Sequence, residues 1–591
     1  MHEDPQFDPK PPDADILCVG FGPATGGFLT TLSRGLAEGG IESQAFPGMP
    51  PQVICYERAD DISFGVSGVV TRARAIRQSF PDFDPAAVPM ATPVRNEKLI
   101  YLLDPEGATR RPAWLQAADW ILNAFSSLSK VRHHAFDVPF VPDFLHKRDG
   151  YVMALGQFNQ WVGQQVMMSG QAQIWPSTPV AEPLVENGKV AGVVLAGDGS
   201  EVRAPLTVVA DGPVGAVSRR LDDIFGLPDG HERDEWALGM KFVIELPEGV
   251  DLEPGTVYHT IGYPEPEIFG FFYVHPDRVV SAGIFVPSWM QSPVRTGYRY
   301  LQHFIQHPFF WRFLKGGKLR SWGAKSILES GKHGEPHLAG DGYARIGENS
   351  GSTNVLTGSG VDEAWLTGVQ LGEAVLELMR EGKPFTRDNL DAAYVARRRA
   401  SWLEKEGEIA ENARNGFQKS LLSGFLGMAL DGLSGGRLHL TRPRVRKPPQ
   451  KLIDAYFGRL PHSYVEKLVA GCLKEGRPIH DALMDAVGWP EIPFDGQLLV
   501  SHQDALLVGG KVQAPSDAAD HVIFRDQALC QSCDTRICIE ICSGEAIRPG
   551  EGAVPAFDRE KCVHCGACLW NCPSANVSFA AAPGGLHSAE N

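Results

Sequence analysis

The sequence predicts a large protein of mixed α/β and α+β class with three structured parts, on three observations. A glycine-rich turn follows the first apolar run, within residues 16–26. Short β-rich runs separated by turn residues fill the middle of the chain, from about residue 151 to 361. Eight of the 11 cysteines then lie between residues 530 and 572. At 591 residues the chain is long enough for two or three packed domains, since a domain usually spans about 100–200 residues.

The composition is that of a globular protein and argues against nucleic acid as the main partner. Lys and Arg total 55 against 71 for Asp and Glu, a formal net charge of -16, whereas phosphate binding needs a basic surface. No apolar run approaches the roughly 20 residues of a membrane-spanning helix. The polar, Pro-rich start has no pattern of a secretory signal. We therefore expect no signal peptide and a location on the cytoplasmic side, where crowded cysteines bind metal rather than form disulfides.

The first segment has the pattern of a Rossmann-like βαβ unit. In CVGFGPATGG, the glycines Gly20, Gly22 and Gly26 follow a strand-like run, and we interpret them as a G-x-G-x-x-G fingerprint. Gly20 would permit the tight turn, Gly22 the approach of the backbone to a pyrophosphate, and Gly26 the close packing of helix on strand. A helix is expected from residue 26 to 36. Glu57, at the end of the next strand, is placed to bind the ribose hydroxyls.

Together with two later segments, this pattern predicts that the protein binds FAD. Asp211-Gly212 follows a strand in TVVADGPVGAVSRR, and Gly347-Glu348 opens a loop that leads past Gly360 into a long helix. In one-site flavoproteins of the p-hydroxybenzoate hydroxylase and glutathione reductase type, such segments touch the pyrophosphate and ribityl chain and aim a helix N-terminus at the flavin ring. No second fingerprint follows a strand, so we expect no nicotinamide nucleotide. The predicted FAD-binding residues of these motifs are Gly20, Gly22, Pro23, Ala24, Gly26, Glu57, Asp211, Gly212, Gly347, Glu348 and Gly360.

The cysteine runs predict a ferredoxin-like domain with [4Fe–4S] clusters. CVHCGACLWNCP has the C-x2-C-x2-C-x3-C-P spacing in which three thiolates bind one cube and the fourth reaches a second. The earlier run, CQSCDTRICIEIC, has a longer middle gap and Ser543 in place of the proline, so one cluster is expected firmly and a second stays open. Zinc is the alternative for paired CxxC units. The first ligand set is Cys542, Cys562, Cys565 and Cys568, and the second is Cys530, Cys533, Cys538 and Cys572. The other three cysteines are expected in the core.

A flavin domain before a ferredoxin unit resembles the electron-transfer flavoprotein–ubiquinone oxidoreductase family. LEPGTVYHTIGYP, FLKGGKLRSWGAKSILESG and YVMALGQFNQWVGQQ are similar to segments of that family, and FGVSGVV resembles its flavin-touching segment, which adds Ser67 and Gly68 to the FAD site. The resemblance implies a monotopic enzyme that passes electrons from reduced electron-transfer flavoprotein, through [4Fe–4S] and FAD, to a membrane quinone. It also implies one cluster, on the first ligand set. The second set departs from the single-cluster form.

The quinone site and the membrane contact are further expectations of this resemblance. The family's quinone-contacting Gly-Gly reads Phe269-Gly270 here, with Phe271 after it, and core packing is the alternative for these aromatic residues. His259 is a candidate catalytic proton donor because a histidine pKa lies near physiological pH, with a structural role as the alternative. The apolar run 421–430 suits the membrane interface or a buried helix. The basic cluster that follows could meet anionic headgroups and consists of Arg437, Arg442, Arg444, Arg446 and Lys447.

These expectations divide the chain into domains and leave two other functions open. One is a soluble flavin and iron–sulfur electron-carrier subunit of a larger complex, including an electron-bifurcating one. The other is a flavin-dependent reductase of isoprenoid lipids. The predicted parts are a disordered arm (1–12), a discontinuous FAD-binding domain (13–75, 150–235 and 338–400), a cap or insertion (76–149), a β-rich quinone or substrate domain (236–337), a helical, membrane-docking segment (401–450), a connecting region (451–519), the ferredoxin-like domain (520–580) and a tail (581–591).

Overall fold

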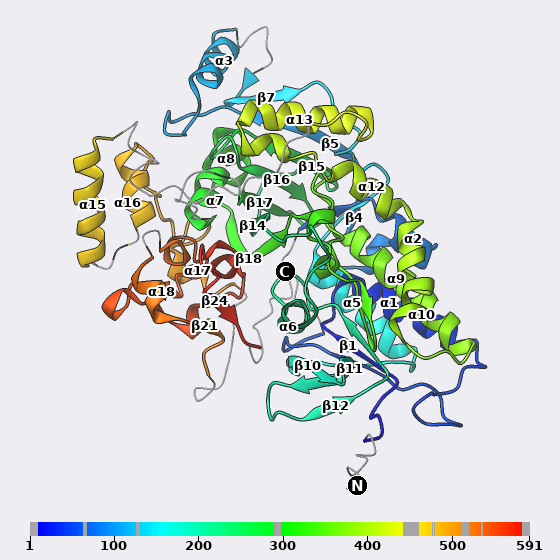
Figure 1. The fold of residues 1–591 in the computed structure, drawn as a ribbon. Helices are drawn as coiled ribbons and strands as arrows, with labels where there is room; N and C mark the ends of the chain where they lie inside the picture. Colours follow the sequence, from blue (N-terminus) through cyan, green and yellow to red (C-terminus); the bar gives the residue numbers. More distant parts are fainter. Residues whose placement is uncertain are drawn as a thin grey trace.

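The fold is that of a computed structural model, shown in Figure 1. It describes residues 10–62, 68–125, 131–288, 290, 297–440, 460–475, 477, 479–509, 519–533 and 536–581. Several sequence predictions lie outside these residues. They concern most of the N-terminal arm and C-terminal tail, Ser67, and the basic residues Arg442, Arg444, Arg446 and Lys447.

A six-stranded sheet carries the predicted nucleotide motifs. Its strands, in spatial order, are β19 (Ala339–Gly340), β20 (Tyr343–Arg345), β13 (Leu206–Val209), β1 (Ile16–Val19), β2 (Val53–Tyr56) and β9 (Gln173–Trp175). All neighbours are parallel except β19 and β20. Every residue of β1 is buried, because a parallel strand covered on both faces needs a continuous apolar run.

Different layers cover the two faces of this sheet. Ile16 and Cys18 of β1 pack in one core with α1 (Pro23–Ala37), α5 (Leu155–Met168) and α9 (Val361–Arg380). Leu17 and Val19 point the other way, into a core shared with α6 (Ala216–Phe225) and the antiparallel sheet β10 (Val180–Glu186), β11 (Lys189–Leu195) and β12 (Glu201–Arg203). Helix α1 begins at Pro23, three residues before the predicted start, because proline suits the first position of a helix.

A second, eight-stranded sheet forms the middle of the molecule. Its order is β18 (Lys318–Leu328), β14 (Trp236–Glu245), β17 (Val279–Pro287), β16 (Phe269–Val274), β15 (Thr256–Ile261), β5 (Asn96–Leu102), β7 (Ala135–Val138) and β6 (Val131–Arg132). The last three strands come from the segment 76–149 that the sequence predicts as a cap, and β5 pairs with β15 in parallel. Helices α7 (Gly297–Gln306) and α8 (Pro308–Leu314) pack against the sheet. A small sheet of β3 (Val69–Thr71), β8 (Tyr151–Met153) and β4 (Thr92–Pro93) lies against β16.

The C-terminal part packs on the edge of the eight-stranded sheet. Helices α15 (His462–Glu475), α16 (Ile479–Ala486) and α17 (His502–Ala505) share its core. The cysteine-rich unit follows, drawn in orange and red next to β18 in Figure 1. It consists of α18 (Gln527–Gln531), α19 (Ile537–Glu540), α20 (Ala567–Asn571) and the antiparallel pairs β21 (Val522–Phe524) with β24 (Val577–Phe579) and β22 (Ile547–Arg548) with β23 (Ala556–Phe557).

The remaining helices lie around these sheets. They are α2 (Arg74–Ser79), α3 (Ala113–Ala124), α10 (Arg387–Leu390), α11 (Ala396–Arg399), α12 (Trp402–Ala410) and α13 (Leu421–Ser434). Over the part of the chain that the structure describes, none of the helices has both the length and the apolar character to cross a membrane.

Candidate functional site

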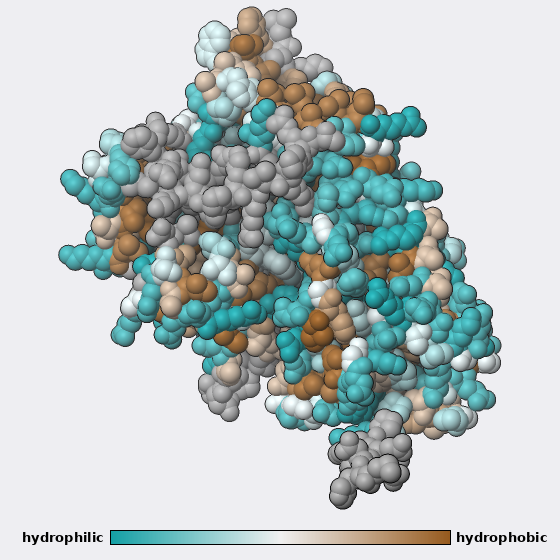
Figure 2. Space-filling model, in the orientation of Figure 1, coloured by the Kyte–Doolittle hydropathy of each residue, from teal (hydrophilic) through white to brown (hydrophobic). Residues whose placement is uncertain are grey.

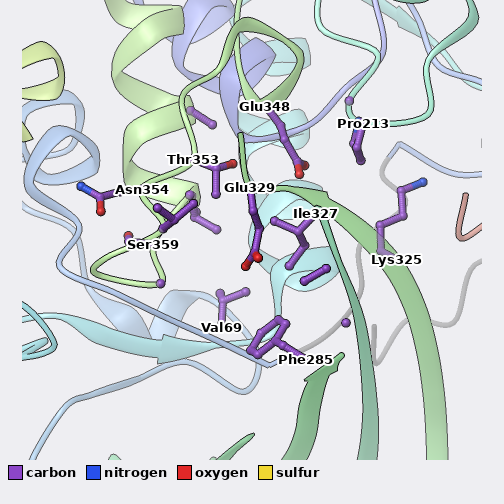
Figure 3. Close-up of a pocket in the computed structure, with 18 of the residues that line it drawn as sticks. Val69, Pro213, Phe285, Lys325, Ile327, Glu329, Glu348, Thr353, Asn354 and Ser359 are labelled. Atoms are coloured by element: carbon purple, nitrogen blue, oxygen red, sulfur yellow. The ribbon is translucent and has the colours of Figure 1, made fainter. Parts of the chain in front are cut away.

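One cavity of about 690 Å³ lies where both large sheets, α13 and the cysteine-rich unit meet. All of the predicted FAD- and quinone-binding residues that the structure describes line it, except Gly26. His259 lines it too. Figure 3 shows part of its wall, with Glu348, Glu329, Lys325 and Thr353 on neighbouring segments. The structure thus brings together residues that are far apart in the sequence.

The glycine turn after β1 leaves room for a phosphate group. Gly20 has a φ of +88°, and a Cβ atom there would lie 2.9 Å from the carbonyl oxygen of Ala210, so only glycine fits. A Cβ at Gly22, the residue before α1, would meet nothing within 4 Å. The N-terminus of α1 therefore faces open space, which is the arrangement that binds a pyrophosphate.

Gly26, the third glycine of the predicted fingerprint, has another role than the one predicted for it. Strict G-x-G-x-x-G spacing puts the last glycine at position 25, where the chain has Thr25, whose hydroxyl donates to the carbonyl of Gly20 at 2.6 Å. Gly26 packs against Trp365 of α9 and Val162 of α5, at 2.9 and 3.1 Å from an added Cβ. Its small size therefore serves the contact between helices, not the predicted contact between helix and strand.

Glu57 has the position expected for a ribose-binding carboxylate. Its side chain is buried at the edge of the cavity, and its two oxygens accept hydrogen bonds from the amides of Phe21 (2.7 Å) and Ala59 (2.9 Å). Burial raises the pKa of Glu57, and these two bonds oppose the shift. A carboxylate has about four acceptor sites, so these bonds leave capacity for a pair of ribose hydroxyls.

Backbone amide groups also hold the side chains of the other two predicted carboxylates, Asp211 and Glu348, in place. Asp211 accepts a hydrogen bond from the amide of Ser218 at 3.0 Å, and Glu348 accepts one from the amide of Leu328 at 2.8 Å. Burial raises the pKa of Glu348 to about 7, against the opposing effects of the Leu328 amide and the Lys325 ammonium group. Glu348 can therefore carry a proton inside the cavity near neutral pH.

These features fit FAD. Helices α1 and α9 both begin at the cavity, and Gly360 precedes α9 without a side-chain cap, so the amides of its first turn are available to a ligand. The sequence prediction puts Gly22 and Glu57 at the AMP half and the pyrophosphate, Asp211 at the pyrophosphate and ribityl chain, and Gly347, Glu348 and Gly360 at the ribityl chain and flavin ring, and all six line the cavity. When bound, FAD would supply redox chemistry of one or two electrons.

Two buried lysines in the cavity wall were missed from the sequence. Lys241 of β14 donates to the carbonyl of Gly68 at 3.1 Å, and burial lowers its pKa to about 7. Lys325 of β18 reaches the carbonyl of His564 at 3.4 Å, and burial lowers its pKa to about 7 as well. The available signal was a single lysine inside an otherwise apolar strand, as in WALGMKFVIE.

The predicted quinone residues combine cavity lining with packing. Phe269 makes an edge-on contact with Phe425 of α13, with ring centres 6.4 Å apart, and Phe271 stacks on Tyr273 at 4.4 Å. A Cβ at Gly270 would lie 2.5 Å from the hydroxyl of Thr260, so this glycine is required by close packing. Strand β16 therefore takes part in the core and also lines the cavity, and the contact of these residues with a quinone stays a prediction.

His259 lies in the cavity wall, bound to a carboxylate from another segment. Its Nε2 is 2.7 Å from Oε1 of Glu97 on β5. Burial lowers the pKa of His259, while the hydrogen bond and charge of Glu97 oppose the shift. Glu97 also contacts His146, which the sequence alone did not connect with the site because 49 residues separate the two.

The clustered cysteines influence one another's pKa mainly within the two sets predicted from their spacing. Burial raises the pKa of Cys568, and the charges of Cys542, Cys565 and Cys562 raise it further. In the same way, burial and then the charges of Cys572, Cys533 and Cys530 raise the pKa of Cys538. Such mutual effects require that these thiols lie near one another. Cys538 also raises the pKa of Cys568, and Cys542 that of Cys538, so the two sets adjoin, and the assignment of each thiol to a cluster stays a prediction.

Backbone and side-chain donors point at the sulfur atoms of both groups. The amide of Ala546 donates to Sγ of Cys542 and the amide of Asn576 to Sγ of Cys572, both at 3.2 Å. The side chain of Asn576 also donates to Cys530. Hydrogen bonds to sulfur are typical of iron–sulfur sites, where they tune the reduction potential. In the described parts of the chain, no three His, Cys, Asp or Glu side chains are close enough to hold a single metal ion.

The other three cysteines are buried in the core. Cys18 and Cys55 face each other on neighbouring strands β1 and β2, and Cys472 lies on α15. Burial raises the pKa of all three thiols, which keeps them protonated and unreactive. Their prediction as packing residues is confirmed.

Two segments of the chain match models of known protein families, and most of the chain matches known enzymes. Residues 236–327 match the family model described as "ETF-QO, ubiquinone-binding", and residues 554–578 match a "4Fe-4S binding domain". The chain is 27% identical to the electron transfer flavoprotein-ubiquinone oxidoreductase of Pseudomonas aeruginosa over 413 residues, covering 66% of this chain and 68% of the relative. It is 24% identical to the mitochondrial enzyme of Dictyostelium discoideum over 612 residues, covering 97% and 89%. Among solved structures, a geranylgeranyl bacteriochlorophyll reductase-like protein of Thermoplasma acidophilum gives a TM-score of 0.48 at 15% identity, over 77% of this chain and 98% of that one.

The protein is a flavoprotein-type oxidoreductase with an iron–sulfur domain, as the nucleotide-binding sheet, the cavity and the matched 4Fe–4S segment define it. Relatives that match 66% and 97% of this chain are electron transfer flavoprotein–ubiquinone oxidoreductases. The family resemblance that the sequence motifs indicate is thereby confirmed, and so is the predicted fold class.

Proposed function

We propose that the chain takes electrons from a reduced electron-transfer flavoprotein and delivers them, with FAD and [4Fe–4S] bound, to a quinone at a membrane surface. One observation supports this most: a single cavity is lined by the nucleotide-binding turn, by the strand β16 and by residues next to the cluster cysteines. The ubiquinone-binding match over residues 236–327 includes the cavity-facing parts of β14, β15, β16 and β18.

The iron–sulfur unit contacts the cavity wall directly. The amide of Ser326 on β18 donates to the carbonyl of Cys565 at 2.7 Å, and Lys325, the residue before it, faces the cavity. His564 lines the cavity as well. Cys565 of the first ligand set therefore adjoins the cavity wall, which supports the transfer of electrons between this set and a flavin in the cavity.

Helix α13 supports a membrane contact. Leu422, Leu426 and Leu430 are 50%, 54% and 39% exposed and lie on one face, at a spacing of four residues. Phe425 and Met428, on the other side of the helix, line the cavity. A helix of 14 residues with one apolar face toward solvent suits the plane of a membrane interface. In this arrangement the helix separates the cavity from lipid.

A second apolar surface accompanies α13. On α3, Trp120 is 70% exposed and Ile121 is 50% exposed, and Phe140 in a following loop is 65% exposed and also lines the cavity. Figure 2 shows brown side chains over α3 and α13 at the same end of the molecule. We infer that the protein is a peripheral membrane protein and that this end of it docks on the cytoplasmic face of the inner membrane. Tryptophan is favoured at such interfaces.

The number of clusters is part of the proposal. We infer two [4Fe–4S] clusters, because the thiols of the second set receive N–H donors of the same kind as those of the first, and three of them raise the pKa of the fourth, Cys538. The alternative for these thiols is that they bind no cluster.

The test is steady-state reduction of a short-chain ubiquinone by the purified protein, with reduced electron-transfer flavoprotein as the donor. We expect turnover that needs both the donor protein and the quinone, and recovery of the protein with membranes unless detergent is added. Full recovery in the soluble fraction without quinone turnover would favour an electron-carrier subunit of a larger complex. Reduction of a prenyl lipid without quinone turnover would favour an isoprenoid reductase.

A further inference from the structure

Glu97 bridges two histidines that come from different parts of the chain. Its Oε1 is 2.7 Å from Nε2 of His259, and its Oε2 is 2.8 Å from Nδ1 of His146. The amide of Lys147 donates to both carboxylate oxygens, at 3.0 and 2.9 Å. The carboxylate is therefore held in one orientation, with one imidazole on each oxygen.

The three side chains connect the surface with the cavity. The side chain of His146 is 18% exposed, that of Glu97 only 5%, and the ring of His259 lines the cavity. His259 lies on β15 next to Thr260, opposite Phe271 of the predicted quinone segment on β16. Because Nε2 of His259 is engaged with Glu97, Nδ1 is the nitrogen that can serve a ligand in the cavity.

We propose that Glu97 and His146 deliver protons from the surface to His259, which passes them to the quinone. This inference rests on the proposed function. A quinone that becomes a quinol gains two electrons and two protons: the electrons come from the electron-transfer flavoprotein, and the protons come from solvent. Each proton enters at His146 and crosses Glu97 to Nε2 of the Nδ1–H tautomer of His259, while the proton on Nδ1 leaves to a quinone oxygen. The ring then returns from the Nε2–H to the Nδ1–H tautomer before it takes the second proton. His259 is thus the catalytic residue, and Glu97 and His146 are positioning and relay residues.

The surroundings of the path are consistent with repeated proton transfer. Burial by itself would raise the pKa of Glu97, but the bonds from His259, Lys147 and His146 outweigh it and bring the pKa to about 2. Glu97 is therefore an anion at rest and holds a proton only in passing. The Lys147 ammonium group, which lowers the pKa of His259, is the other charge beside the path, and Tyr273 is the neighbour whose pKa the carboxylate of Glu97 raises.

Lys147 is the competing source of protons. It is buried, lines the cavity and donates to the carbonyl of Thr357 at 2.8 Å. Burial lowers its pKa to about 8, and the charge of Glu363 opposes that shift. It lacks the connection to the surface that His146 supplies, since its side chain is almost fully buried (1% exposed).

The experiment compares two acceptors on the full-length protein with its cofactors bound. Short-chain quinone takes protons with its electrons, whereas ferricenium takes one electron and no proton. We expect His146→Gln and Glu97→Gln to slow quinone reduction at least about tenfold, to increase the solvent deuterium isotope effect, and to leave ferricenium reduction unchanged. Free imidazole should restore part of the quinone turnover of His146→Ala. A matched control is His462→Gln, which removes a surface histidine 3.7 Å from Glu466.

The outcomes separate this inference from the proposed function. If the unsubstituted protein reduces ferricenium but no quinone, the proposed function fails. If the unsubstituted protein reduces quinone and the two glutamine variants reduce it at the same rate, the proton path fails. It also fails if these variants lose the reduction of quinone and of ferricenium to the same extent. If only Lys147→Met loses quinone turnover, the protons come through Lys147 and the path through His146 is overturned.

Discussion

The amide of Ser326 donates a hydrogen bond of 2.7 Å to the carbonyl oxygen of Cys565. Ser326 belongs to β18 of the cavity wall, and Cys565 is one of the predicted cluster ligands. The bond ties the two parts of the electron path together through their backbones. The effect of a substitution in either part can therefore be assigned to one cofactor only when the content of the other cofactor is measured as well.

The cluster count gives the first prediction. In the unsubstituted protein, we expect about eight iron atoms and about eight acid-labile sulfides per flavin, since each cube holds four of each. The double variant Cys530→Ser/Cys533→Ser should retain about four, because the first ligand set is intact. Iron, sulfide and flavin assays of anaerobically purified protein measure these ratios. About four irons per flavin before any substitution would rule out the second cluster.

The glycine turn gives the second prediction. Gly22→Val should weaken FAD binding at least about tenfold, because the added side chain occupies the open space that we assign to the pyrophosphate. Gly27→Ala is the matched control, since its Cβ would lie 2.4 Å from the carbonyl of Trp365 in α9. It should lower the free energy of unfolding by about 1–3 kcal/mol while the folded fraction retains FAD. Equal FAD loss in both variants would contradict the assignment of Gly22.

The buried carboxyl of Glu348 gives the third prediction, on pH. Its pKa rises from 4.5 to about 7 on folding, chiefly because of burial, so the folded state binds the proton more tightly than the unfolded state. The stabilisation from this proton is complete below pH 4.5 and is lost as the pH rises toward 7. By about 1.4 kcal/mol per pKa unit, the loss is about 3 kcal/mol.

Glu348→Gln should remove this dependence, because an amide does not titrate. Denaturant unfolding at several pH values between 4.5 and 8 measures the free energy of unfolding of both proteins. The contributions of the other titrating groups cancel in the difference between the two values. A difference that does not change with pH would show that folding leaves the pKa of Glu348 unchanged.

The exposed face of α13 gives the fourth prediction. Leu422→Asp/Leu426→Asp should reduce binding to anionic lipid vesicles about 100-fold, because each leucine contributes about 1.5 kcal/mol or more when buried in the interface. Ile224→Asp on α6 is the control, as this residue is 39% exposed and lies away from α13. Vesicle flotation and quinone turnover report the effect. Unchanged flotation of the double variant would place the lipid contact elsewhere or exclude it.

Much of the site could be predicted from the sequence because its motifs are local. The turn around Gly22, the pair Asp211-Gly212 and the cysteine spacings each lie within one short segment, where the geometry that the ligand needs dictates the residue types. The cavity then unites them through the parallel order of the first sheet. The helix start at Pro23 and the role of Gly26 were less well predicted, because helix packing depends on α9, more than 300 residues away.

The remainder depends on contacts between distant segments. Glu97 and His259 are 162 residues apart and meet only because β5 pairs with β15. The cavity lysines Lys241 and Lys325 lie in strands whose apolar pattern predicts burial but not what they face. No single segment carries a signal for such pairs, since their spacing in the sequence is set by the fold and not by the chemistry.

The pairing of β5 with β15 also limits how the chain can be divided. Residues 76–149 supply three of the eight strands in the central sheet and so cannot be removed as a detachable lid. Deleting them would expose the edge of β15 and its row of unpaired backbone groups. A chimera with a related enzyme would have to exchange this segment and residues 236–337 together, from the same parent enzyme.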